Sequence, residues 1–398
     1  MKTQDYIAIE DQFGAHNYHP LDVVVAEAKG AWVTDVEGNK YMDCLSAYSA
    51  VNQGHCHPKI MEAFIEQAKH VTLTSRAFRN NQLPLLYKKL NEMTGYENFL
   101  PMNSGAEAVE TAIKTARKWA YKKKGLKQNT AEIIVADGNF HGRTTTIISF
   151  STDPDAFNDY GPFTPGFVVA QYGDAEDFRS KINANTAAIM IEPIQGEAGI
   201  FVPPDGFLKE IEKMCKENNV LFICDEIQSG LGRSGKLFAH YYEGVRPDIV
   251  IIGKALAGGF YPASGVLADR DILGVFKPGE HGSTFGGNPL AAAVACKSLD
   301  VIIEEKLIER SFELGNYFMD RLRAIQSPHI KQVRGKGLWI GFVLDVKARP
   351  YCEALMKEGL LCKETHDNII RFAPPLVITK EEIDWAIERI EKVVKNLD

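Results

Sequence analysis

The chain has 398 residues, a formal net charge of −7 and 45% hydrophobic residues. This composition is typical of a soluble globular protein with enough residues for two domains, and its negative charge disfavours nucleic acid as a partner. The seven cysteines include no C-x-x-C pair, which indicates reduced thiols rather than a disulfide framework.

Neither a membrane span nor a metal site is expected. No apolar run is long enough to cross a bilayer, and no cluster of His, Cys and Asp has the spacing of metal ligands. The first twenty residues contain neither the apolar core of a signal peptide nor an arginine-rich amphipathic stretch. We therefore expect a cytoplasmic protein.

The chain divides into three regions by pattern. Residues 1–47 are expected to form an N-terminal arm that packs with the C-terminal domain, and within it residues 29–43 alternate apolar and polar side chains like a β-hairpin. Residues 48–306 alternate helices with short apolar strands, which predicts a large domain with a mostly parallel sheet. Residues 307–398 contain long amphipathic helices, which predict a smaller α+β domain.

Particular elements can be placed within these regions. In the large domain the expected strands are 132–136, 187–191, 220–224 and 249–252, and a helix is expected over 206–219. In the small domain, strand-like segments cover 338–346 and 369–372.

Two residues with reactive side chains follow neighbouring strands of the expected sheet. Asp225 ends the run that begins at Val220, and Lys254 follows the run 249–252. Because ligands of open α/β sheets bind beyond the carboxyl ends of the strands, both side chains should reach one cleft. A buried lysine beside an acid suits Schiff-base chemistry.

Other loops offer weaker signals. Ser104 and Glu107 form a capping box at the start of a helix, and Gly105 would let a phosphate approach the free N–H groups, although most capped helices bind nothing. In the loop after strand 132–136, Phe140 and Arg143 suit ring stacking and carboxylate capture, but a core phenylalanine and a surface arginine explain them equally well.

Two further loops contain carboxylates and hydroxyls. Glu192 and Glu197 follow strand 187–191, and pairing with an arginine is a better explanation than a metal site. The glycine-rich segment 282–289 is either a flexible loop or a second phosphate contact.

The segment Gly230–Lys236 fits both G-x-G-x-x-G and G-x-x-x-x-G-K, which would make a nucleotide-binding protein the alternative. The second motif ends on Leu237 instead of Ser or Thr, so the hydroxyl that binds Mg²⁺ is missing. The first motif begins several residues after the strand and opens no clear helix. We therefore expect a structural turn.

The ordered segments SGAEA, NFHGRT, EPIQGEAG, DEIQSGLGRSG, GKALAGG, HGSTFGGNP and RGKGL resemble the class III (ω-amino-acid) aminotransferases, which are pyridoxal-phosphate enzymes of fold type I. The resemblance runs from GAHNYHP to RFAPPL, nearly the whole chain. It implies an α/β fold with a mostly parallel central sheet, a smaller α+β domain and a homodimer. The segments around Tyr18, Tyr48 and Arg371 match members that act on ornithine, with acetylornithine and 4-aminobutyrate as alternative substrates.

The resemblance also implies roles in cofactor binding. Lys254 would carry the covalent link to pyridoxal phosphate, and Asp225 would keep the pyridine nitrogen protonated. Phe140 would stack on the ring, and Gln228 would reach the ring oxygen. Gly105 and Ala106 would hold the phosphate, which Ser283 and Thr284 would also reach from the neighbouring subunit.

The substrate residues implied by the resemblance lie elsewhere. Arg143 and Tyr18 would bind the end of ornithine that carries the α-carboxylate and α-amine, and Tyr48 would line the substrate site. Arg371 would bind the α-carboxylate of 2-oxoglutarate or glutamate, and Glu197 would cover Arg371 while ornithine is bound. The expected reaction moves the δ-amino group of ornithine to 2-oxoglutarate.

Overall fold

The computed structural model describes residues 1–397. Its largest element is a seven-stranded sheet in the order β4-β10-β9-β8-β7-β5-β6. Strand β10 runs antiparallel to β4 and β9, and all other pairings are parallel. The strands are β4 (Asn98–Met102), β5 (Glu132–Ala136), β6 (Phe167–Ala170), β7 (Thr186–Ile191), β8 (Leu221–Asp225), β9 (Ile249–Ile252) and β10 (Ser264–Ala268).

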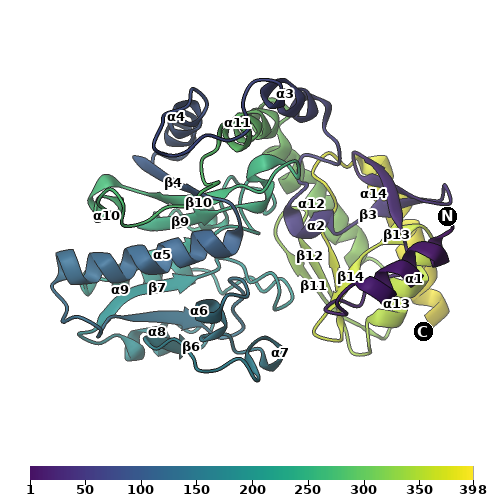
Figure 1. The fold of residues 1–398 in the computed structure, drawn as a ribbon. Helices are drawn as coiled ribbons and strands as arrows, with labels where there is room; N and C mark the ends of the chain where they lie inside the picture. Colours follow the sequence, from purple (N-terminus) through teal and green to yellow (C-terminus); the bar gives the residue numbers. More distant parts are fainter. Residues whose placement is uncertain (398) are drawn as a thin grey trace.

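Helices cover both faces of this sheet (Figure 1). The alternating side chains of β5 show the division, since Ile133 packs with α5 (Gly105–Trp119) while Ile134 packs with α8 (Ala175–Lys181) and α9 (Phe207–Glu217). Burial on both faces explains why β7 and β9 are apolar along their whole length.

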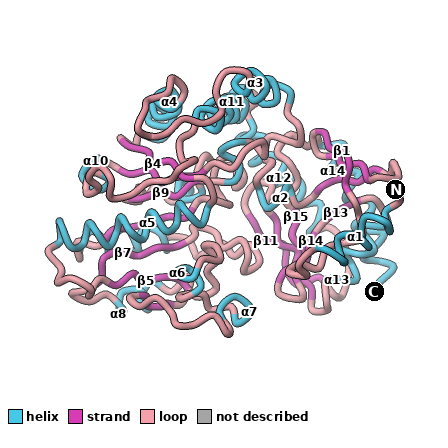
Figure 2. Tube along the Cα trace, viewed as in Figure 1, coloured by secondary structure: helices cyan, strands magenta, loops and turns pink. Residues whose placement is uncertain are grey.

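Shorter elements connect the strands, and three helices gather beyond the β4 edge, as the tube view shows (Figure 2). These three are α3 (Pro58–Ala68), α4 (Leu83–Thr94) and α11 (Pro289–Glu304). The connecting elements are α6 (Thr145–Ile148), α7 (Pro154–Phe157), α10 (Arg270–Leu273), the π-helix η1 (Ala120–Lys124) and the 3₁₀-helices η2 (Ala239–Tyr242) and η3 (Lys254–Ala257).

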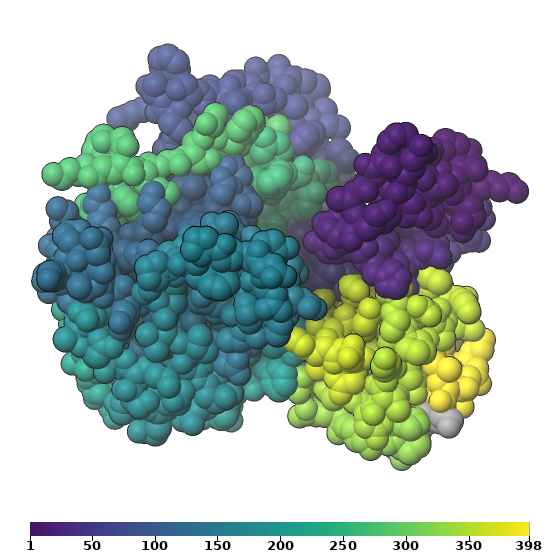
Figure 3. Space-filling model, turned by 60° about the horizontal axis from the view of Figure 1, so that its bottom comes forward, coloured from purple at the N-terminus to yellow at the C-terminus, as the bar shows by residue number. Residues whose placement is uncertain are grey.

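The smaller part of the molecule joins both ends of the chain. One sheet has the order β1-β2-β3-β13 and the other β11-β12-β15-β14. Strand β3 pairs in parallel with β13, so N-terminal residues lie against C-terminal ones (Figure 3). The elements are β1 (Val25–Lys29), β2 (Trp32–Asp35), β3 (Lys40–Asp43), β11 (Ile330–Gly335), β12 (Ile340–Leu344), β13 (Leu360–Leu361), β14 (Lys363–Thr365), β15 (Ile369–Phe372), α1 (Thr3–Phe13), α2 (Ser46–Ser49), α12 (Leu307–Arg323), α13 (Arg349–Lys357) and α14 (Lys380–Leu397).

The expected strands are confirmed with shifts of one or two residues at their ends, and β2 and β3 form the expected hairpin. Strands β4, β6 and β10 of the large sheet were not predicted. Pro101 in β4 disfavours a central strand, and the structure places β4 at the sheet edge. Gly265 in β10 weakens the strand pattern, but a Cβ there would lie 2.4 Å from the Phe99 ring, so the close pairing requires glycine. None of the described helices combines the length and apolar character that a membrane crossing needs.

Candidate active site

A pocket with about 550 Å³ of empty space opens at the carboxyl ends of the parallel strands. Asp225 is the last residue of β8, and Lys254 follows β9 after one glycine, so the sheet itself brings the acid and the amine together. Six residues predicted for cofactor binding line the pocket: Gly105, Ala106, Phe140, Asp225, Gln228 and Lys254.

The Lys254 amine is half-buried and has no hydrogen bond or ion pair to any residue in the described part of the chain. Burial lowers the pKa of this amine from its ordinary value, while the nearby carboxylates of Glu197 and Asp225 oppose the shift. The backbone at Lys254 has a φ of +43°, a strained conformation for a residue with a Cβ. An amine with a lowered pKa and no partner is suited to act as a nucleophile and to carry protons.

Asp225 is held on both oxygens. Its Oδ2 lies 2.7 Å from Nδ1 of His141, and its Oδ1 accepts a hydrogen bond from the Ile227 amide at 3.0 Å. Burial alone would lower the pKa of His141, but the hydrogen bond and charge of Asp225 outweigh it and raise that pKa. No sequence pattern predicted a role for His141, whose only signal was its position between Phe140 and Arg143 in a loop at a strand end.

The two carboxylates of the EPIQGE segment have different partners. Glu197 pairs with Arg371, as predicted for this segment, with 2.8 Å between Oε1 and Nη1. For Glu192 the prediction of an arginine partner was wrong, because its oxygens accept hydrogen bonds from the Phe140 and Gly196 amides at 2.8 and 3.4 Å. Burial raises the pKa of Glu192 to about 7.

The start of α5 closes another side of the pocket. The predicted capping box is confirmed, since Ser104 Oγ accepts from the Glu107 amide at 3.2 Å and Glu107 Oε2 accepts from the Ser104 amide at 2.7 Å. The amides of Gly105 and Ala106 precede the first hydrogen-bonded turn and have no partner within the helix. They therefore offer an anion site inside the pocket.

The Arg371–Glu197 pair links the two parts of the molecule, since Glu197 follows β7 of the large sheet and Arg371 lies on β15 of the smaller part. The Arg371 side chain is 4% exposed and that of Glu197 is 28% exposed. Burial would raise the pKa of Glu197, but the charge and hydrogen bond of Arg371 outweigh it and lower that pKa. The Tyr48 ring lies 5.0 Å from the Arg371 guanidinium carbon, and Nε of Arg371 is buried without a hydrogen-bond partner among the described residues.

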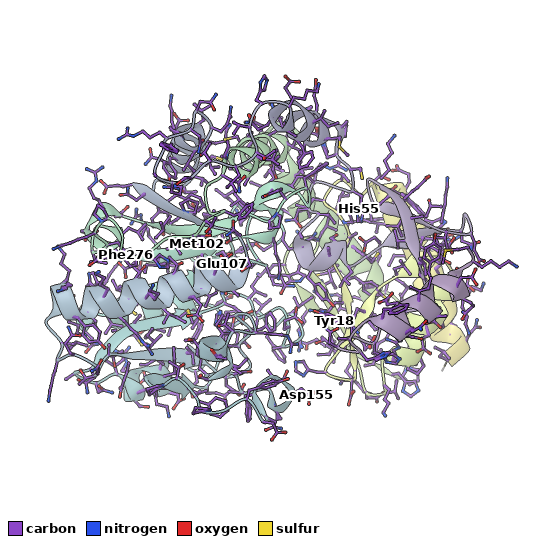
Figure 4. The ribbon with its side chains drawn as sticks, in the orientation of Figure 1. Tyr18, His55, Met102, Glu107, Asp155 and Phe276 are labelled. Atoms are coloured by element: carbon purple, nitrogen blue, oxygen red, sulfur yellow. The ribbon has the colours of Figure 1, made fainter. Side chains whose placement is uncertain are left out.

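The other predicted substrate residues are more exposed. The Arg143 guanidinium lies 5.8 Å from the Phe140 ring and forms no ion pair with another described residue. Tyr18 is 73% exposed and lies on the edge of the smaller part of the molecule (Figure 4).

Ser283 and Thr284 do not line the Lys254 pocket of their own chain. They border a separate depression with residues 73–76, where Ser283 Oγ accepts a hydrogen bond from Asn103 Nδ2 at 2.8 Å.

The glycine motif of residues 230–236 is a turn, as predicted, and its glycines are packed against protein. A Cβ at Gly235 would lie 3.0 Å from Phe312 on α12, and Arg233 within the motif is fully buried. This packing leaves no room for nucleotide phosphates, so the alternative of a nucleotide-binding protein has no support in the structure.

Comparison with known proteins gives the family. The model of the family described as "Aminotransferase class-III" matches residues 13–394. The chain belongs to this family. A class-III aminotransferase uses pyridoxal phosphate, and the pocket fits that group, because it combines a free amine, a buried acid, an aromatic ring and an open helix N-terminus.

Three similar proteins are informative about this class-III aminotransferase. A protein of Geobacillus sp. (strain WCH70) named ornithine aminotransferase is 63% identical over 392 residues, 98% of each chain. The structure of the ornithine aminotransferase from Toxoplasma gondii superposes with a TM-score of 0.98 at 44% identity, covering 99% of this chain and 94% of the other. The acetylornithine aminotransferase from Elizabethkingia anophelis has a TM-score of 0.91 at 49% identity, covering 100% of both chains.

Proposed function

We propose that this class-III aminotransferase moves the δ-amino group of L-ornithine to 2-oxoglutarate, producing glutamate 5-semialdehyde and glutamate. The observation that carries the proposal is the ion pair of the buried Arg371 with Glu197, 2.8 Å apart and close to the free amine of Lys254. The relatives named ornithine aminotransferase support the same choice of substrate.

Bound pyridoxal phosphate supplies the electron sink that transamination needs. In our proposal Lys254 would hold the cofactor, and its amine would carry a proton to and from the substrate carbon. Asp225, oriented by His141, would accept a hydrogen bond from the pyridine nitrogen. The ring and phosphate contacts are assigned as predicted, to Phe140, Gln228, Gly105 and Ala106.

Which of the two amines of ornithine reacts depends on which arginine binds the α-carboxylate. Glu197 occupies Arg371, so the α-carboxylate of ornithine binds to the unpaired Arg143 instead, with Tyr18 near the α-amine. The δ-amine then reaches Lys254 and the cofactor. Glutamate and 2-oxoglutarate carry a second carboxylate, which separates Glu197 from Arg371 and supplies a partner for the buried Nε.

We further propose a homodimer in which Ser283 and Thr284 reach the cofactor phosphate of the partner. Arg76 Nη1 donates to the Gly286 carbonyl at 3.2 Å, so the glycine-rich loop is joined to the segment around residue 76. Both segments present apolar side chains to solvent, with Phe78 71% and Phe285 44% exposed, and a second copy would cover them. We also propose the division into residues 1–47, 48–306 and 307–398, and a cytoplasmic location.

A substrate panel tests the proposed function. Ornithine, N-acetylornithine and 4-aminobutyrate are each supplied with 2-oxoglutarate, and glutamate formation is measured. We expect kcat/KM for ornithine to exceed the other two by at least about tenfold, because a site built for charged groups discriminates strongly against analogues that lack them. A preference for N-acetylornithine would instead favour the activity named for the Elizabethkingia anophelis structure.

A further inference from the structure

The short segment α2 (Ser46–Ser49) is wound in the left-handed sense. Its four residues have φ angles of +52°, +46°, +56° and +72°, and none of them is glycine. Left-handed backbone brings Cβ close to the following carbonyl oxygen, so a run of such residues is strained. Strain of this kind persists only where surrounding contacts impose it, and it concentrates at functional sites.

Before the turn, Asp43 supplies the contacts that impose the strained backbone. Asp43 Oδ1 accepts hydrogen bonds from the Leu45 and Ser46 amides at 2.8 and 3.0 Å, and its Oδ2 lies 2.7 Å from Nε2 of His55. The hydroxyl of Ser46 then donates to the Ala373 carbonyl at 2.6 Å. The first residue of α2 is thereby attached to the segment that follows β15.

Arg233, the buried arginine of the glycine motif, holds the chain after the turn. Its Nε and Nη2 donate to Asn52 Oδ1 at 3.1 and 2.7 Å, and its Nη1 donates to the Leu338 and Pro374 carbonyls at 2.6 and 2.7 Å. Pro374 directly follows Ala373, so both anchors of α2 end on the same two residues. Those residues lie immediately beyond Arg371 on β15.

This arrangement fixes the position of one side chain relative to another. Tyr48 is the third residue of α2, and its ring lies 5.0 Å from the Arg371 guanidinium carbon. We propose that α2 is a positioning element, whose anchors hold its strained backbone in place, keep the Tyr48 ring on Arg371 and so keep Arg371 paired with Glu197 while ornithine reacts. The proposal deepens the function proposed above and depends on it.

The effect of the ring on the ion pair is physical. An aromatic face over a guanidinium attracts the cation and also excludes water from it. With less water, the attraction between Arg371 and Glu197 is screened less. If α2 became flexible, the ring would leave this position part of the time, and the α-carboxylate of ornithine would compete for Arg371. The α-amine of ornithine would then be delivered to the cofactor.

Ser46→Ala tests this inference, because it removes the hydrogen bond by which the Ser46 hydroxyl ties the strained turn to the Ala373 carbonyl. Without that anchor the backbone can relax from its left-handed φ angles, and the Tyr48 ring leaves Arg371 part of the time. We expect the ratio of α- to δ-transamination of ornithine to rise between about twofold and thirtyfold, the range that one cation–π contact supports. The two cyclised products, pyrroline-2-carboxylate and pyrroline-5-carboxylate, are separated and counted by NMR.

Ala47→Gly is the matched control, since Ala47 is exposed and glycine accepts left-handed φ angles without strain, so every anchor of α2 is kept. Its product ratio should not exceed that of the wild type. Asn52→Ala, which removes the acceptor of Arg233 Nε and Nη2, should shift the ratio in the same direction as Ser46→Ala and covers the case in which that variant folds poorly. Wild-type ratios in both Ser46→Ala and Asn52→Ala would overturn the inference, whereas a wild-type enzyme inactive with ornithine would overturn the proposed function.

Discussion

Two regions of the site are built in different ways. Around Lys254, the chemical groups lie at the ends of adjacent strands of one sheet or on the loops that follow them, and Asp225 has a partner on each oxygen. Around Arg371, the groups come from residues 46–49, the loop at Glu197 and strand β15, and the Nε of Arg371 is buried without a partner among the described residues.

The difference suggests a division of tasks. A pocket built on one sheet, with its acid held on both oxygens, suits a cofactor that stays in place through both halves of a reaction. An ion pair with an unused donor suits a site that has to open for one substrate and stay closed for the other, because a second carboxylate would supply the missing hydrogen bond. Substitutions in the two regions should therefore have different consequences.

In the first region, Lys254→Ala should have the largest effect on activity. We expect transamination of ornithine to fall by at least about 10⁴-fold, since the variant loses both the attachment of the cofactor and the group that moves the proton. The thermal unfolding midpoints of the two cofactor-free proteins should be close, because the amine forms no hydrogen bond or ion pair with another described residue that the variant could lose. The visible absorbance of the purified protein should change as well, and an active variant would contradict the role proposed for Lys254.

The second region is tested by Glu197→Ala, which should alter the choice of product rather than abolish turnover. With Arg371 uncovered, the α-carboxylate of ornithine binds there, and we expect α-transamination to rise by roughly tenfold or more relative to δ-transamination. Glu197→Gln keeps the shape of the side chain and should give an intermediate ratio. An unchanged ratio in both variants would show that the pair does not select the amine.

Local patterns predicted much of the fold and of the first region. Runs of apolar residues placed β5, β7, β8 and β9, and the acid and amine after two of these strands were expected to share a cleft, as they do. Such runs did not predict β4 and β10, where Pro101 and Gly265 break the strand pattern. Pro101 is tolerated because β4 lies at the edge of the sheet, and Gly265 is tolerated because its strand packs closely against Phe99. Both reasons are tertiary features.

The second region could not be predicted from local patterns. Glu197 and Arg371 are 174 residues apart, and only their resemblance to family motifs placed them together before the structure did. Nothing in the sequence SAYS indicates a left-handed turn, since none of its residues is glycine. His141 was missed and the partner of Glu192 was predicted wrongly, because the roles of both depend on burial and on contacts with loops of other strands.

Glu192→Gln tests the first region through pH-dependent stability rather than turnover, and it measures how dry the environment of this carboxyl is. The folded pKa of Glu192, about 7, is higher than the ordinary value of about 4.3, so the folded state binds more protons between these values. The contribution of Glu192 to stability is therefore lost as pH rises through this window, by on the order of 3 kcal/mol. The glutamine variant avoids that loss, so its unfolding free energy relative to the wild type should increase between pH 5 and pH 8. Glu62→Gln, at an exposed position on α3, should show no such trend, and a pH-independent difference for Glu192→Gln would mean that its carboxyl is not held in a dry environment.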